Sequence, residues 1–304
     1  MKISVVMAVY NGEKYIEEQL MSILSQSIIP DELIIQDDGS SDSTTDKIQS
    51  ITEKSDVSVK LIKNKENLGF SKNFITAISA ASGEYIFLSD QDDIWKKDRI
   101  KRALSVMEDN KNILALSSAF DLIDEDGVVI KKADNSKKLV NISQKEFIKH
   151  PKFPGMAMVF KKELWEYLQH NGKVDWESGI AHDWAINYVA LKKHGMYKLE
   201  ESLICYRQHS SNTFGTAMAG GFNQKDKRIK LIKSLMDNAR GIKAESQSEE
   251  KLLEGIVGFN EKRIHFYEHD RLLRLLLHEF AHMKYISLRS IMGDIYTNLR
   301  GRNR

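Results

Sequence analysis

The sequence predicts an α/β fold, with an open, mostly parallel sheet flanked by helices and a helical C-terminal extension. Between residues 3 and 88, short apolar β-rich segments alternate with helical patterns, which is typical of parallel sheets covered by helices. Polar clusters follow three of these segments, at Tyr10-Asn11-Gly12, Asp37-Asp38-Gly39-Ser40 and Asp90-Gln91-Asp92-Asp93. Because the carboxyl ends of parallel strands meet at the edge of the sheet where ligands bind, the clusters predict one shared site.

The elements of this fold can be placed in order. Each predicted strand is a short apolar run bounded by turn residues, and these runs cover residues 3–9, 32–36, 57–63, 84–88, 114–118 and 156–160. Each predicted helix has apolar residues at helical spacing, and the first three helices cover residues 13–25, 43–52 and 71–81. Beyond Gly220-Gly221 the sequence becomes basic and helix-rich, which predicts the extension.

Composition narrows the classes of protein. A chain of 304 residues suits one large domain, or one domain with a helical appendage. A net charge of +2 gives no case for a nucleic-acid binder, and the single Cys205 excludes an internal disulfide framework and fits a reducing compartment. The first apolar run is too short for a signal peptide, and no stretch reaches the ~18 apolar residues of a membrane span. We expect a cytoplasmic protein.

The three carboxylates of Asp90, Asp92 and Asp93 occupy four consecutive positions after a predicted strand. Such groups repel one another unless a cation or strong hydrogen-bond donors lie between them. Mg²⁺ and Mn²⁺ prefer oxygen ligands, and Mg²⁺ often shares its coordination shell with the phosphates of a substrate. The cluster therefore predicts a phosphate-bearing substrate, and the alternative is a solvated acidic turn.

Several motifs, taken in order, resemble family 2 glycosyltransferases. They comprise residues 5–12, 22–27, 36–42, 67–69, 82–86, 90–95, 182–184 and 206–212, and the last three are similar to a rhamnosyltransferase-like subset. The resemblance covers about residues 1 to 215 and implies a GT-A (Rossmann-like) fold, a nucleotide-diphospho-sugar donor and inversion at the anomeric carbon. We accordingly predict a catalytic domain at 1–220, with a donor half at about 1–110 and an acceptor half at about 111–220, and a helical extension at 221–304.

The resemblance implies a donor site. Ala8 and Tyr10 would lie beside the nucleobase, and Asp38 would accept a hydrogen bond from its imide N–H, which favours uridine or thymidine. Asp90 would hold the ribose hydroxyls. Asp37 is either functional or a turn residue that caps the following helix.

Three further donor-side residues are implied in the same way. Lys72 would lie near the nucleotide, although an exposed helix lysine is an equal alternative. Arg207 would contact the diphosphate. Gly155 would let the backbone approach the donor sugar closely.

The resemblance also implies a metal site for Mn²⁺ or Mg²⁺. Asp92 would ligate the cation, which would neutralise charge on the departing diphosphate. His209 would complete the shell, unless it is an ordinary loop histidine. Asp93 is either a further ligand or the cap of a helix that starts near Ile94.

Asp183 is the predicted general base, because a sugar hydroxyl must lose a proton as it attacks the anomeric carbon. The alternative for Asp183 is a helix N-cap, and both roles are compatible. Many relatives have an acidic residue just before this aspartate, where this chain has His182. Trp184 is either an acceptor-side platform for a sugar or a core residue.

These inferences predict an inverting, metal-dependent glycosyltransferase. The expected donor is dTDP-L-rhamnose, otherwise a UDP-sugar, and the expected acceptor is a cell-surface polysaccharide or a lipid-linked oligosaccharide. A catalytically inactive nucleotide-sugar-binding scaffold is an alternative, which the intact Asp92 and Asp183 disfavour. A zinc hydrolase at His278-Glu279-Phe280-Ala281-His282 is a remote alternative, because the H-E-x-x-H match lacks the extended form that supplies a third ligand.

The C-terminal extension has basic helices with apolar stripes. Such helices either lie on an anionic membrane surface, at the inner face of the cell membrane, or pack against the catalytic domain or a second subunit. We expect surface contact for 225–236 and 289–304, and packing for 256–280.

Overall fold

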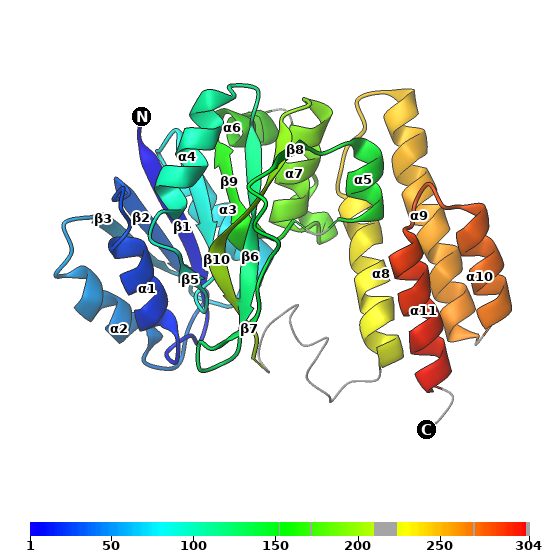
Figure 1. Cartoon of the computed structure of the whole chain (residues 1–304), viewed down its shortest axis with the longest axis horizontal. Coiled ribbons are helices and arrows are strands. Elements are labelled where there is room, and N and C mark those ends of the chain that lie inside the picture. Colours follow the sequence, from blue (N-terminus) through cyan, green and yellow to red (C-terminus); the bar gives the residue numbers. More distant parts are fainter. Residues whose placement is uncertain (152, 171, 210–223, 270, 302–304) are drawn as a thin grey trace. The chain divides into compact units, whose positions relative to one another are not determined.

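The computed structural model describes residues 1–301 except 152, 171, 210–223 and 270, and the chain divides into two compact units (Figure 1). Unit 1 comprises Met1–Ile142, Phe153–Tyr167 and Ile186–His209. Unit 2 comprises Ser143–Lys152, Leu168–Ala185 and Ser210–Arg304. The predicted domain boundary at residue 220 falls outside the described residues and stays a prediction.

Unit 1 contains a ten-stranded sheet whose strands are ordered β3-β2-β1-β4-β9-β6-β10-β5, with β7 beside β6 and β8 beside β10. The strands are β1 (Ile3–Val9), β2 (Glu32–Asp37), β3 (Ser58–Lys63), β4 (Tyr85–Ser89), β5 (Ile94–Trp95), β6 (Ala115–Ile123), β7 (Val129–Lys131), β8 (Leu139–Asn141), β9 (Met158–Lys161) and β10 (Met196–Arg207). The first four are mutually parallel. β9 runs antiparallel between β4 and β6, and β6 is parallel to β10.

Helices cover the parallel strands of unit 1. They are α1 (Ile16–Leu24), α2 (Thr44–Thr52), α3 (Phe70–Ala80) and α4 (Arg99–Asp109), and a short 3-10 helix, η1 (Gly155–Ala157), precedes β9. Ile16, Leu20 and Ile23 recur at helical spacing on α1 and are buried in one cluster with Val5 and Met7 of β1. α3 packs on β1 and β2 and is drawn behind the strands in Figure 1. Strands covered in this way read as continuous apolar runs, which is why the sequence identifies them.

The predicted α/β fold is confirmed, with one local correction. Ile94 does not begin a helix, because Ile94–Trp95 forms β5 and pairs with β10, while α4 begins at Arg99. Asp93 therefore caps no helix at Ile94. β10 escapes sequence analysis because charged residues interrupt its apolar pattern, and its register shifts between Leu199 and Ser202 in a bulge.

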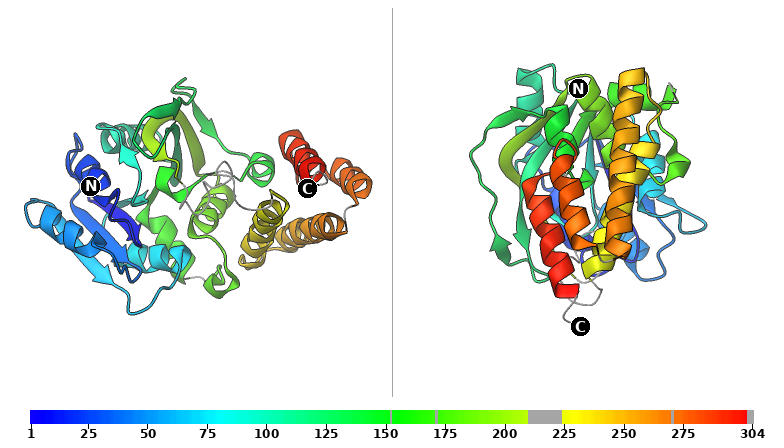
Figure 2. Two further views of the ribbon diagram at one scale, coloured as in Figure 1. Left: turned by 90° about the horizontal axis from the view of Figure 1, so that it is seen from below. Right: turned by 90° about the vertical axis from the view of Figure 1, so that its right-hand side faces the viewer.

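Unit 2 contains helical elements that pack on one another. It holds α5 (Gln144–Lys149), η2 (Trp176–Ser178), α8 (Gln224–Arg240), α9 (Gln247–Glu268), α10 (Leu272–Ala281) and α11 (Leu288–Gly301), while α6 (Lys162–His170) and α7 (His182–Lys192) extend across the division between the units. α9 packs on α8 and α10, and α11 packs on α8 and α10. Figure 2 shows α9, α10 and α11, coloured orange to red, side by side. No helix in the described part of the chain combines the length and apolar character needed to cross a lipid bilayer.

A buried ionic network joins these helices. Asp294 of α11 accepts hydrogen bonds from Arg228 of α8, from Arg263 of α9 at 2.6 Å, and from the Tyr267 hydroxyl at 2.7 Å. Arg263 also pairs with Glu279 of α10 at 3.0 Å, and both acidic side chains are fully buried. Burial, followed by hydrogen bonding and repulsion from Asp294, raises the pKa of Glu279 to about 9, whereas the pKa of Asp294 stays below its usual range.

The apolar stripe of α8 does not point away from unit 2, contrary to the expectation of surface contact for 225–236. Ile232 and Met236 are buried in a cluster with Tyr267 and Leu275. The apolar side of α9 packs as expected, with Ile256 and Phe259 buried. In α10, however, only the inner face is covered, because Leu273 and Leu277 are exposed.

We predict that Glu279→Gln leaves stability unchanged near pH 5 and makes the protein increasingly more stable than wild type toward pH 9. The folded state holds Glu279 protonated above its unfolded pKa of 4.5, so wild type loses stability as the pH rises between these two values. A glutamine keeps the neutral hydrogen-bonding group and avoids this loss. Urea unfolding followed by circular dichroism at several pH values measures the difference, and a pH-independent difference would contradict the assignment.

Asp294→Asn is the matched variant with the opposite expectation. It removes the charge that Arg228 and Arg263 share, so we expect the free energy of unfolding to fall by about 3–5 kcal/mol across the same pH range. The same urea titrations provide the measurement. A loss no greater than that of an exposed substitution would show that the network contributes little to stability.

Candidate active site

The site lies where β1 and β4, adjacent parallel strands, reach their carboxyl ends. The chain proceeds from β1 to β2 and β3 on one side of β1 and returns to β4 on the other, so this is a topological switch point of the kind at which open α/β sheets bind ligands. The Gln91 amide joins the two ends, because its Oε1 accepts from the Tyr10 N–H at 2.8 Å and its Nε2 donates to the Tyr10 carbonyl at 3.0 Å. The predicted convergence of polar clusters is present here.

The end of β1 is also tied to the loop after β2. The Asn11 N–H donates to the Ser40 hydroxyl, and the Asn11 side-chain carbonyl accepts from the Ser41 N–H, both at 2.9 Å. Asn11 has a φ of 46°, a conformation that asparagine tolerates better than most residues. A Cβ atom on Gly12 would lie 2.4 Å from Oε1 of Gln91, so glycine leaves room for the amide bridge.

Asp37 and Asp38 are both buried, but they serve different loops. Asp37 accepts from the Ser40 N–H, so it stabilises the turn and not the helix that follows, which begins at Thr44. Asp38 Oδ1 accepts from the Asn64 amide and the Leu68 N–H at 2.8 Å, and Oδ2 accepts from the Gly69 N–H at 2.9 Å. A carboxylate offers about four lone-pair positions, so these three donors leave Asp38 one position for a further N–H.

The acidic cluster after β4 has the geometry of a cation site. Ligand oxygens of Asp90, Asp92 and Asp93 lie within 4.8 Å of one another, and the cluster is the one such group in the described part of the chain. His209, which follows β10, places its Nε2 2.8 Å from Oδ2 of Asp92. The structure thus brings together two residues 117 positions apart that the resemblance assigned to one metal. Carboxylate and imidazole ligands suit Mn²⁺ or Mg²⁺.

Asp93 is the buried member of this cluster. Its Oδ1 accepts from the Arg207 N–H at 3.0 Å, and its Oδ2 is buried without a hydrogen-bond partner among the described residues. Burial, reinforced by the charges of Asp92 and Asp90, raises the pKa of Asp93 well above its ordinary value. A cation between the carboxylates would remove this repulsion and give the orphaned oxygen a partner. The residues therefore fit a divalent metal.

Arg207 is an internal support of the acidic loop. Its guanidinium is 1% exposed, donates to the backbone carbonyls of Asp92 at 2.8 Å and Glu125 at 3.0 Å, and pairs with Glu18 of α1. The Tyr15 ring lies 4.7 Å from its Cζ atom. The predicted contact with a diphosphate would require the guanidinium to leave these partners, and that role stays a prediction.

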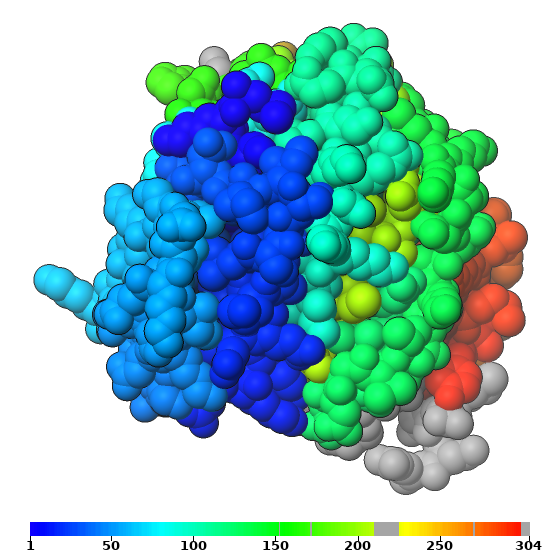
Figure 3. Space-filling view, turned by 60° about the vertical axis from the view of Figure 1, so that its left-hand side comes forward, coloured from blue at the N-terminus to red at the C-terminus, as the bar shows by residue number. Residues whose placement is uncertain are grey.

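Two segments that Arg207 contacts, the N-terminal segment with Glu18 and the segment after β6 with Glu125, also meet at the surface of unit 1. Lys14 and Glu125 form an ion pair at 2.8 Å. In the space-filling view, the blue surface of the N-terminal segment meets the green surface of the segment after β6 (Figure 3). Arg207 lies beneath exposed charges of both segments, so a single buried side chain links them.

The structure gives the positions of three other predicted donor residues, and their roles stay predictions. Ala8 is half-buried in β1 beside Gln36, Lys72 is exposed in the first turn of α3, and Gly155 is buried at the start of η1. The next residue, Met156, accepts from the fully buried Arg99 at 2.6 Å.

The predicted acceptor-side residues begin α7, in unit 2. Asp183 is half-buried in the first turn, and its Oδ1 accepts from the Trp184 N–H at 2.7 Å. Burial lowers the pKa of His182, so its imidazole is neutral at pH 7. Trp184 is 9% exposed and packs on Phe147 with ring centroids 5.4 Å apart. Trp184 is therefore a core residue, and it does not form an open platform for a sugar.

The H-E-x-x-H segment forms no metal site. Glu279 pairs with Arg263 in the buried network, and the His278 ring contacts the Phe259 carbonyl at 3.1 Å. His282 Nδ1 lies 2.8 Å from the His278 carbonyl. The match is a coincidence of helical spacing, and the hydrolase alternative is wrong.

Sequence analysis missed the residues that hold the site in place. Gln91 was overlooked between two acidic neighbours, although a side-chain amide there is suited to bridging backbone groups. Arg99 was also missed: its guanidinium donates to the Leu88 and Met156 carbonyls, lies 3.7 Å from the Trp95 ring, and has a pKa that burial lowers to about 9. Buried arginines give no periodic signal in a sequence.

The final three residues of the predicted 206–212 motif, Ser210, Ser211 and Asn212, lie outside the described residues.

Known proteins resemble this chain in sequence and in fold. The family profile described as Glycosyl transferase family 2 matches residues 4–168. A dTDP-rhamnosyl transferase, RfbG of Shigella flexneri, is 30% identical over 240 residues, which cover 75% of this chain and 79% of that protein.

Two solved structures share the fold. S. aureus TarS 1-349 in complex with UDP-GlcNAc has a TM-score of 0.62 at 19% identity, covering 88% of this chain and 73% of the other. The mannosyltransferase PcManGT from Pyrobaculum calidifontis, in complex with GDP-Man and Mn²⁺, has a TM-score of 0.60 at 18% identity, covering 92% of this chain and 75% of the other.

We predict that Arg207→Met lowers the free energy of unfolding by roughly 1.5–3 kcal/mol, because the carbonyls of Asp92 and Glu125 lose part-buried hydrogen bonds to a charged guanidinium. Glu18→Gln is the matched control, and since Glu18 is 54% exposed, we expect a loss below about 1 kcal/mol. Urea unfolding monitored by tryptophan fluorescence measures both. Equal losses would mean that the ion pair, and not the carbonyl contacts, accounts for the role of Arg207.

Proposed function

We propose that this chain, which belongs to glycosyl transferase family 2 and is a glycosyltransferase, is an inverting, metal-dependent enzyme that uses a nucleotide-diphospho-sugar donor. The predicted family and the GT-A fold are confirmed by the family profile, the 30% identical relative and the shared fold of the two solved structures. The observation that carries the proposal is the cluster of Asp90, Asp92 and Asp93 at the switch point, with His209 in contact with Asp92.

The central residues of the donor site have proposed tasks. Asp92 and His209 would hold Mn²⁺ or Mg²⁺, with Asp93 as a further ligand, and Asp90 would hold the ribose hydroxyls. That ion would supply Lewis-acid stabilisation of the diphosphate leaving group. Asp38 would use its remaining lone-pair position for the imide N–H of the base, beside Ala8 and Tyr10.

The expected donor is dTDP-L-rhamnose, with a UDP-sugar as the alternative. Thymine and uracil both present the imide N–H that Asp38 would bind, so the site chemistry alone does not separate them. The relative of Shigella flexneri, a dTDP-rhamnosyl transferase, supports the thymidine donor.

Transfer would proceed by direct displacement at the anomeric carbon. The acceptor hydroxyl would lose its proton to the carboxylate of Asp183 as its oxygen attacks, and the nucleoside diphosphate would leave from the opposite face. The half-buried position of Asp183 in the first turn of α7 supports this role, since its carboxylate is only partly covered by the protein. We propose a saccharide of a cell-surface polysaccharide or a lipid-linked oligosaccharide as the acceptor, and a cytoplasmic location.

Calorimetric titration tests the donor site. We expect dTDP or UDP to bind in the presence of Mn²⁺, and EDTA to abolish most of the heat, because the cation would bridge the acidic cluster and the diphosphate. The preferred nucleotide identifies the base. Failure of both nucleotides to bind with Mn²⁺ would contradict the proposed donor site.

Asp92→Asn tests the metal assignment. We expect kcat to fall roughly 10²–10³-fold, as when one electrostatic contact to a transition state is lost, and Mn²⁺ affinity to fall in parallel. Asp126→Asn, at an exposed acidic residue of the β6–β7 turn, is the control and should leave both unchanged. Wild-type, metal-dependent turnover by Asp92→Asn would remove Asp92 from the metal site.

Asp183→Asn tests the general base. We expect kcat to fall roughly 10²–10⁴-fold, with nucleotide affinity close to wild type. A parallel loss of nucleotide affinity would instead assign Asp183 a structural role. Nucleotide binding without turnover in wild type would favour the inactive scaffold.

A further inference from the structure

We propose that the outer face of the α10–α11 helix pair is a docking surface for an anionic lipid bilayer. Three large apolar side chains on α10 (Leu273, Leu277, Phe280) and three on α11 (Leu288, Met292, Tyr296) are between 47% and 73% exposed. Within each helix they recur three or four residues apart, so each set forms one stripe. Six large apolar side chains exposed on two helices that pack together are uncommon on proteins that contact only water.

The inner faces of α10 and α11 bury acidic side chains as well as apolar ones. Their inner faces carry Leu275 and Ile291, together with the acidic residues of segment 271–298, which are Glu279 and Asp294. Both carboxyls are fully buried in the network with Arg263. The polar interactions of this segment are therefore made inward, and its outer face is left to apolar and basic side chains.

The charges exposed on this segment are all positive at neutral pH. Arg271, Arg274, Lys284 and Arg289 are exposed, and none of them forms an ion pair with an acidic residue in the described part of the chain. Apolar side chains surrounded by unpaired lysines and arginines are typical of helices that lie in the interface of membranes with anionic lipids. Such cations are attracted to the negative surface potential of these membranes.

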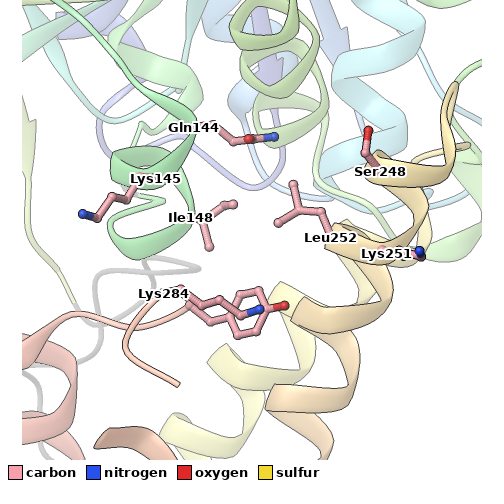
Figure 4. Close-up of a pocket in the computed structure, with 8 residues that line it drawn as sticks. Gln144, Lys145, Ile148, Ser248, Lys251, Leu252 and Lys284 are labelled. Atoms are coloured by element: carbon pink, nitrogen blue, oxygen red, sulfur yellow. The ribbon is translucent and has the colours of Figure 1, made fainter. Parts of the chain in front are cut away.

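A crevice beside the α10–α11 connection has the same chemistry. Its volume is about 360 Å³, and it is lined by Gln144, Lys145, Ile148, Ser248, Lys251, Leu252, Lys284 and Tyr285. Figure 4 shows Ile148 and Leu252 pointing toward each other across it, with the chain of Lys284 along its lower side. The crevice thus has apolar walls and one lysine along it, a combination that suits the first methylene groups and the phosphate of a lipid.

Charge decides between a membrane and a second copy of this chain. In a twofold dimer the same face meets itself, so the four cations of one copy would approach those of the other. Because no acidic side chain of 271–298 is exposed, the face offers them no partner. An anionic lipid surface complements both the charge and the apolar character, and it is where a lipid-linked acceptor would be found.

Vesicle sedimentation of the full chain tests this surface. Vesicles of phosphatidylcholine are compared with vesicles that also contain phosphatidylglycerol, without nucleotide or metal. We expect binding to the anionic vesicles only, weakening as salt screens the charges. The inference deepens the proposed lipid-linked acceptor, but the assay needs no transfer activity, so either proposal can fail without the other.

Variants separate the two parts of the surface. Leu277→Gln with Met292→Gln, and separately Arg274→Glu with Arg289→Glu, should each lower vesicle affinity at least tenfold while circular dichroism stays unchanged. Ile130→Gln, at a 54% exposed apolar residue of β7, is the matched control and should bind as wild type does. Absent binding to anionic vesicles, or binding that both double variants retain, overturns the proposal. So does light scattering that shows a wild-type dimer converted to monomer by Leu277→Gln with Met292→Gln.

Discussion

The candidate site depends on holding three carboxylates together at the end of one strand. Like charges within 4.8 Å oppose this arrangement, and burial, reinforced by this repulsion, raises the pKa of Asp93 well above its ordinary value. The protein counters this repulsion with backbone and side-chain dipoles and with the positive charge of arginine. Arg207 holds the loop by its backbone N–H and guanidinium, and Gln91 fixes it to Tyr10. These internal contacts hold the loop in one position, which would lower the cost of binding the proposed metal-diphosphate.

The C-terminal helices also bury acidic side chains close together, but there arginines lie beside the carboxyls. Arg228 and Arg263 lie among Asp294, Glu279 and Tyr267, so both acidic side chains of segment 271–298 are buried in the network and neither reaches solvent. In unit 1, the acidic cluster is incompletely neutralised, which fits the proposed cation site. In segment 271–298 of unit 2, burial of both acidic side chains leaves only basic charges exposed. Both outcomes follow from the high cost of burying a charge without a partner.

The sequence predicted the strands and helices whose apolar residues follow a local pattern. β1, β2 and β4 are buried on both faces and read as apolar runs, and the polar clusters that follow them could be assigned to one edge. β10 could not be read in this way, because Lys198, Glu200 and Glu201 interrupt it around a bulge. The contact of His209 with Asp92 depends on the order of strands in the sheet, which a single sequence does not reveal. The burial of Arg207 against backbone carbonyls is likewise a tertiary property, which a single sequence does not reveal.

The carbonyl contacts of Arg207 have an evolutionary consequence. Every residue type has a backbone carbonyl, so Arg207 can hold positions 92 and 125 whatever side chains they carry. The turn after β6 can therefore accumulate substitutions without releasing its anchor, provided that its backbone path is kept. Diversification of that turn and preservation of the acidic loop are, in this structure, separable requirements.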